Sequence, residues 1–171
     1  MKKITLLYLF VLISNIGLVH SQSLDYLEQN DNIQSYVVNK KMFEMMSKIK
    51  VDSKDAEAQK YIQLLQKLDQ LQVFSTKNVK ASEEIKKASE QYLTKNNLQE
   101  LMRTNTNGKQ VKIFAKQGNK ANEVKELLMH IDGSENILLL LKGTFGLDEI
   151  ALLTEKMNIP GGDELKKANK K

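Results

Sequence analysis

The chain has 171 residues, of which 26 are lysine or arginine, 21 are aspartate or glutamate and none is cysteine. Arg103 is its only arginine, whereas proteins that read nucleic acids favour the planar guanidinium group, so the composition argues against a nucleic-acid binder. Without cysteine no disulfide can form. Stability must therefore come from the buried core. The length predicts that this core belongs to one domain.

Residues 1–21 have the three-part layout of a cleaved secretory signal peptide. Two lysines follow Met1, an apolar run extends from Ile4 to Ile13, and small or polar residues come next. Val19 and Ser21 take the two positions that guide cleavage, which predicts a cut after Ser21 and an exported protein, periplasmic or extracellular. A membrane anchor is the alternative, but the run falls short of the about 20 residues that span a bilayer. Because no cysteine follows, a lipoprotein is not expected.

Residues 22–34 are polar and poorly periodic, so we expect a flexible leader there, before a single domain at residues 35–162. Tyr36, Val37 and Val38 are expected to open the first helix. The apolar stripe of that helix includes Met42, Phe43, Met45 and Met46. Such a stripe is either a deformable binding face or, more commonly, the packed side of an amphipathic helix. Those of the four side chains that prove exposed form the candidate interaction surface.

A helix-start signal at 52–55 predicts a second helix, because aspartate and serine side chains accept hydrogen bonds from free amides of the first turn. Asp52, Asp55 and Glu57 also raise the possibility of a cation site. The segment lacks the glycine and the terminal glutamate of an EF-hand loop, so capping is the preferred interpretation. Leu71–Thr76 is the first predicted strand, and a helix is expected to follow from Asn78 or Ser82.

The second half of the chain predicts a short helical turn and then a sheet. Residues 97–100 have the spacing of a capping box, which predicts a helical turn through Met102. Three predicted strands come next, with turns between them, at Val111–Lys116, Val124–Ile131 and Ile137–Leu141. The third run is apolar on both faces, as in a doubly covered central strand. A helix is expected from Leu147 to the stop at Asn158–Gly162, and a basic, disordered tail at residues 163–171.

The order of these elements predicts an α+β domain. It contains about four strands in a mixed, mostly antiparallel sheet, formed by a crossover followed by a three-strand meander. The helices are expected to pack mainly on one face of this sheet. The lysine-rich tail is interpreted as a solvated end, with attraction to an anionic envelope surface as the alternative.

The sequence offers little catalytic chemistry. After cleavage His130 is the only histidine, and in a strand it shares a face with Glu126 and Leu128. Glu126 and His130 then lie roughly 13 Å apart along the strand, too far for a direct bond. Ser134 lies near, but no nucleophile-elbow signature surrounds it. No glycine-rich phosphate loop and no metal-ligand spacing is present, so we predict no catalytic residues, no cofactor and no metal.

Four stretches carry a family resemblance: residues 41–46, 68–76, 124–129 and 158–162. Together, in this order, they make the chain resemble the Bacteroidetes family called domain of unknown function 4252 (DUF4252) over residues 35–162. The resemblance implies an exported protein of a Gram-negative cell envelope, and it implies no activity, ligand or catalytic residue. Many relatives resemble lipoproteins, and this chain departs from that pattern because it lacks the cysteine.

Three functional hypotheses follow. The first is a non-enzymatic envelope interaction module that binds a protein or an apolar ligand through Met42, Phe43, Met45 and Met46. The second is a carboxylate-based hydrolase of envelope polymers, with Glu126 and His130 as its best candidates. The third is an envelope-stress regulatory protein. An enclosed apolar cavity would favour an apolar ligand, and an exposed patch would favour a protein partner.

Overall fold

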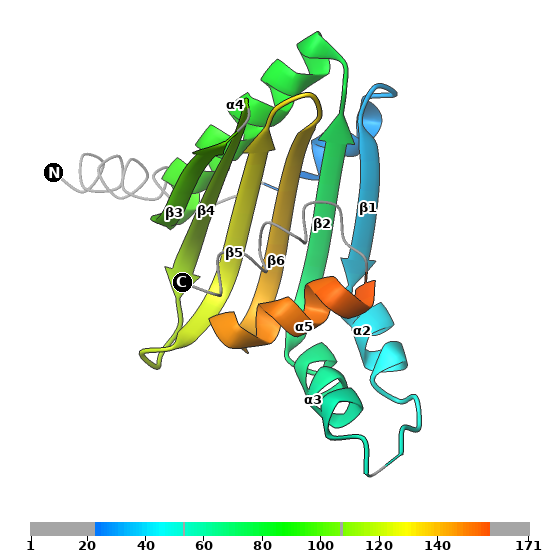
Figure 1. Ribbon diagram of the computed structural model, residues 1–171. Helices are drawn as coiled ribbons and strands as arrows, with labels where there is room; N and C mark the ends of the chain where they lie inside the picture. Colours follow the sequence, from blue (N-terminus) through cyan, green and yellow to red (C-terminus); the bar gives the residue numbers. More distant parts are fainter. Residues whose placement is uncertain (1–22, 53, 107, 158–171) are drawn as a thin grey trace, which may run out of the picture.

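The computed structural model describes residues 23–52, 54–106 and 108–157. They form one α+β domain, as expected, built on a sheet with strand order β1-β2-β6-β5-β4-β3 (Figure 1). The sheet has six strands where about four were predicted, and every neighbouring pair is antiparallel, so the expectation of a mixed sheet was wrong. The elements are η1 (Asp25–Gln29), β1 (Gln34–Asn39), α2 (Lys40–Met46), α3 (Ala56–Leu65), β2 (Leu68–Thr76), α4 (Val79–Asn96), β3 (Gln99–Thr106), β4 (Lys109–Gln117), β5 (Glu123–Asp132), β6 (Asn136–Gly146) and α5 (Leu147–Met157). The predictions for residues 1–21 and 158–171, and for the stop at Asn158–Gly162, lie outside the described residues.

The central strand is β6, as its sequence predicts. It pairs with β5 on one side and with β2 on the other, and residues 136–141 are buried on both faces. Leu138 and Leu140 belong to the core beneath α4, whereas Leu139 and Leu141 belong to the core on the opposite face. An alternating pattern is absent from residues 136–141 because neither face of this stretch meets water.

Helices cover both faces of the sheet, which corrects the expectation of one covered face (Figure 1). Ala81, Ile85, Ala88 and Tyr92 of α4 pack on one face, with Leu128, Leu138 and Leu140 of the sheet. The other face is packed by residues of α2, α3 and α5, namely Phe43, Leu64, Leu65, Ile150 and Leu153. The strands carry buried residues at both odd and even positions, so each face needs its own cover.

The predicted three-strand meander exists as β4, β5 and β6, joined as antiparallel hairpins. It is extended by β3, where a capped helical turn through Met102 was expected. The reason for this difference is Asn97, which adopts a left-handed conformation (φ 54°, ψ 44°) and ends α4. Asparagine tolerates that conformation at a helix C-terminus, so this residue ends one helix instead of starting the next.

The second additional strand is β1, which corrects the prediction that residues 36–38 open a helix. β-branched and aromatic residues fit a strand well, and Tyr36 to Val38 pair with Leu71 to Val73 of β2. The helix begins only after Asn39, whose side chain accepts a hydrogen bond from the amide of Met42 (3.1 Å). The short helix α2 therefore follows the edge strand directly.

The expected flexible leader at residues 22–34 also needs correction where the structure describes it. Asp25–Gln29 forms the 3-10 helix η1, and Leu24, Leu27 and Ile33 are buried in the core beneath α4. Oδ1 of Asp25 accepts a hydrogen bond from Nε2 of Gln72 in β2 (2.6 Å). The three-residue spacing of Leu24 and Leu27 brings both to one side of a 3-10 turn, a pattern too short to stand out among polar neighbours.

Four other predicted elements are present. Asp55 caps α3 by accepting a hydrogen bond from the amide of Ala58 (2.9 Å), and Asn78 caps α4 through the amide of Ala81 (3.1 Å). The predicted strand Leu71–Thr76 is the larger part of β2, and α5 begins at Leu147 as expected. No helix among the described residues is long and apolar enough to cross a membrane.

Candidate functional site

The predicted interaction surface divides into an exposed half and a buried half. Met42 and Met45 lie on the outer side of α2, with exposed fractions of 49% and 58%. Phe43 is fully buried, and Met46 is partly buried against the same core. Residues three apart on a helix share a side, so Phe43 and Met46 pack together against the core while Met42 and Met45 face solvent. The candidate surface is therefore corrected to Met42 and Met45.

Exposed apolar side chains gather around these two methionines in the sequence. Nine large apolar side chains are exposed in the described part of the chain, and five of them lie between residues 36 and 49. We call these five the exposed apolar segment: Tyr36, Val37, Met42, Met45 and Ile49. Sequence reasoning missed Tyr36 and Val37 because it placed them in a helix. The β-branched pair after a tyrosine, followed by a capping asparagine, was the signal for a strand ending at Asn39.

Glu126 and His130 lie on the α4 side of β5 but have separate partners. His130 is buried, and its Nε2 lies 3.0 Å from Oδ1 of Asn136, which accepts the hydrogen bond across the hairpin. Burial lowers the pKa of His130 below its usual range, although the bond to Asn136 opposes this shift. The imidazole of His130 is therefore hydrogen-bonded to a side-chain amide, and not to a carboxylate of the described residues.

Glu126 takes part in a network that joins α4 to the sheet. Its Oε2 accepts a hydrogen bond from the hydroxyl of Tyr92 (2.6 Å), and its Oε1 lies 3.4 Å from Nζ of Lys116. Burial, and then the bond to Glu126, raise the pKa of Tyr92 above its ordinary range. Nζ of Lys142 lies 5.5 Å from the centre of the Tyr92 ring, within the range of a cation–π contact. This network satisfies a buried hydroxyl and positions α4 on the sheet.

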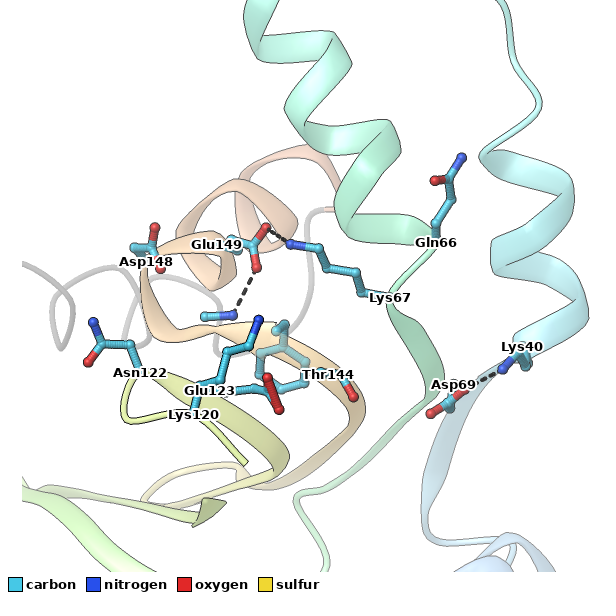
Figure 2. A pocket seen from close by; sticks show the side chains of 12 residues that line it. Lys40, Gln66, Lys67, Asp69, Lys120, Asn122, Glu123, Thr144, Asp148 and Glu149 are labelled. Carbon is cyan, nitrogen blue, oxygen red and sulfur yellow. Dashed lines mark hydrogen bonds and ion pairs between the residues drawn. The ribbon is translucent and has the colours of Figure 1, made fainter. Parts of the chain in front are cut away.

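A hollow of about 680 Å³ lies at the end of the sheet where β6 leads into α5 (Figure 2). Its walls are largely polar and charged and carry two ion pairs: Nζ of Lys67 is 2.7 Å from Oε1 of Glu149, and Nζ of Lys40 is 2.9 Å from Oδ1 of Asp69. Oε2 of Glu149 also accepts a hydrogen bond from the amide of Gly146 (2.8 Å). Its lining contains no histidine or serine. Ligand pockets are mostly apolar, so this hollow does not suit an apolar ligand.

A second hollow, of about 580 Å³, lies beside it and shares Asn122, Glu123 and Asp148 in its lining. It mixes apolar residues, such as Leu101 and Leu147, with polar ones. No group of three histidine, aspartate or glutamate side chains in the described ranges is placed to hold a metal ion. Glu126 and His130 line neither hollow, and no histidine, serine or cysteine lines either one, so the serine or cysteine triad of acyl-transfer enzymes is not found in these two linings.

One family model matches the chain, over residues 26–153, and its description is Domain of unknown function (DUF4252). The match begins inside η1, which agrees with the packing of this segment against the sheet. No curated protein and no solved structure matches the chain.

Proposed function

The chain belongs to the family described as Domain of unknown function (DUF4252), and on that premise we propose that it is an exported, non-enzymatic interaction module. It binds a protein partner through the exposed apolar segment, with Met42 and Met45 of α2 at its centre. Export is supported by the signal-peptide pattern of residues 1–21, which also makes the cell envelope or the exterior the site of action.

The observation that carries this proposal is that five of the nine large apolar side chains exposed among the described residues lie between residues 36 and 49, with Met42 and Met45 together on the outer side of α2. Exposed apolar residues scattered singly are normal on protein surfaces, whereas a concentration of them is typical of interaction sites. Methionine suits such a surface because its unbranched side chain adapts to the shape of a partner. Since the charged hollow of Figure 2 does not suit an apolar ligand, the segment favours a protein as the partner.

The hydrolase hypothesis is weakened by the partners of its best candidates. The carboxylate of Glu126 binds Tyr92 and Lys116, and the imidazole of His130 binds Asn136. A general base must reach the proton that it removes, and neither Glu126 nor His130 lines either of the two hollows in which a substrate could sit. We therefore propose no catalytic residue. A regulatory role in envelope stress would act through the same binding surface.

A crosslinking capture in the native cell tests the proposal. The tagged full-length chain is compared with a variant that combines Met42→Asp and Met45→Asp, and with Val79→Asp as the matched control. Val79 is a 79% exposed apolar residue at the start of α4, outside the segment. We expect the double variant to lose the captured partner and the control to retain it. Equal capture by the double variant and the parent chain would refute the proposal.

A further inference from the structure

The two edges of the sheet differ in how they are protected. An edge strand offers unpaired backbone groups to any other extended chain, and proteins commonly block it with charges or a bulge. The edge strand β3 has both features. It carries the ion pair of Arg103 with Glu100 (2.6 Å), and its register shifts between Glu100 and Met102.

The opposite edge, β1, has neither feature (Figure 1). Its sequence, Gln-Ser-Tyr-Val-Val-Asn, contains no charged residue and no proline, and it pairs with β2 in an unbroken register from Gln34 to Asn39. Tyr36 is 52% exposed and Val37 is 41% exposed, one on each face of the sheet. A regular, neutral edge with exposed apolar side chains is suited to pairing with a further strand.

We propose that β1 is a self-association edge, on which the β1 strand of a second copy of this chain pairs antiparallel. This inference rests on the proposed function and names one partner for the exposed apolar segment. A two-fold axis at Tyr36 would join two six-stranded sheets into one continuous sheet, as in isologous dimers. The two Tyr36 rings would then lie side by side on the same face, a cross-strand aromatic pair that stabilises antiparallel strands.

The charged residues at the two ends of β1 favour a second copy of this chain as the partner, with its β1 strand antiparallel. The exposed Asp31 precedes β1, and the exposed Lys40 and Lys41 follow it. Lys40 also contacts Asp69 (2.9 Å) and Lys41 contacts Glu44 (4.0 Å), but these ion pairs are solvent-exposed and therefore weak, so both lysines keep the end of the strand basic. Antiparallel pairing brings the acidic end of one strand to the basic end of the other, whereas parallel pairing would place like charges together. Two copies of β1 can therefore form both sides of the interface, and residues Gln34–Asn39 carry no charge that would repel the second copy.

Cysteine crosslinking tests this inference directly, because the chain contains no cysteine of its own. Residues opposite one another in an antiparallel pair have Cα atoms roughly 4.5–5.5 Å apart, within the span of a disulfide. Tyr36→Cys in purified residues 22–171 should therefore give a disulfide-linked dimer under mild oxidation. The matched control is Leu101→Cys on the other edge strand, which is 51% exposed and should remain a monomer.

Sedimentation of the cysteine-free protein gives the second measurement. We expect twice the monomer mass for the parent chain and for Leu101→Lys, and the monomer mass for Tyr36→Lys and Val37→Lys, whose folding is checked by circular dichroism. A monomeric parent chain, or equal crosslinking at positions 36 and 101, would overturn the inference. If the parent is monomeric while Met42→Asp with Met45→Asp still abolishes capture, the dimer is refuted and the proposed function stands. If capture is unaffected by those two substitutions, the proposed function fails whatever the mass.

Discussion

Replacing Gly143 with alanine is predicted to destabilise the protein strongly, because two strands approach each other closely there. A Cβ atom at this position would lie 2.4 Å from the carbonyl oxygen of Lys67 and 2.9 Å from Cα of Leu68. The same carbonyl accepts a hydrogen bond from the amide of Thr144 (2.9 Å). Both close atoms belong to the backbone, so no side-chain rotation relieves the contact, and β2 and β6 must separate.

The magnitude follows from two contributions. Forcing an extra methyl group into a packed site costs about 1–3 kcal/mol, and losing the Thr144 bond costs about 1 kcal/mol more. We therefore expect the free energy of unfolding to fall by about 2–4 kcal/mol, a large part of the about 5–15 kcal/mol that domains have. Urea unfolding of residues 22–171, followed by circular dichroism, measures this change.

The control for this prediction is Gly133→Ala in the turn between β5 and β6. There the nearest atom to a Cβ would be Cγ of Lys109 at 3.5 Å, an ordinary contact. We expect this variant to lose less than about 1 kcal/mol, as is usual for an exposed site. If Gly143→Ala unfolds at the same urea concentration as Gly133→Ala, the inference that the backbones of β2 and β6 lie too close for a side chain at Gly143 is refuted.

Three further predictions test other parts of the account. Tyr92→Phe should lower the free energy of unfolding by about 1–3 kcal/mol, because Glu126 loses the hydroxyl that donates to it, and an unchanged urea midpoint would contradict this network. Burial lowers the pKa of His130 in the folded state, so the unfolded state binds more protons at acidic pH. The contribution of His130 to stability should therefore be fully present above a pH of about 6.5 and decline below it. His130→Gln should flatten this decline, and equal slopes of stability against pH in the two proteins would contradict the prediction. The intact mass of the exported protein should correspond to cleavage after Ser21, and a mass that retains residues 1–21 would contradict the predicted signal peptide.

Local signals in the sequence predicted much of the fold. The run Ile137–Leu141 is apolar at every position, which identified the central strand before its partners were known. Helix starts were predicted at residues 52–55 and at Asn78 or Ser82, and the caps observed are Asp55 and Asn78, whose side chains accept from the first free amides. These signals depend only on neighbouring residues, so they can be read without the tertiary structure.

The remaining elements depended on tertiary contacts. Val37 and Val38 form an apolar run too short to separate strand from helix, and pairing with β2 decides between them. The two apolar sides of α2 look alike in sequence, since Phe43 and Met46 alternate with Met42 and Met45. Only the position of α2 against β2 determines which pair is buried. The candidate surface could therefore be located by sequence to one helix, but not to one side of it.

Site-specific photo-crosslinking at position 45 is the most direct test of the claim that the exposed apolar segment binds a protein. A photoreactive residue replaces Met45 in the full-length chain in its native cell, and Val79, which is more exposed, carries it in the control. We expect a defined protein adduct at position 45, a second copy of the chain included, and none at position 79. No adduct at position 45, or the same adducts at both positions, would contradict this claim.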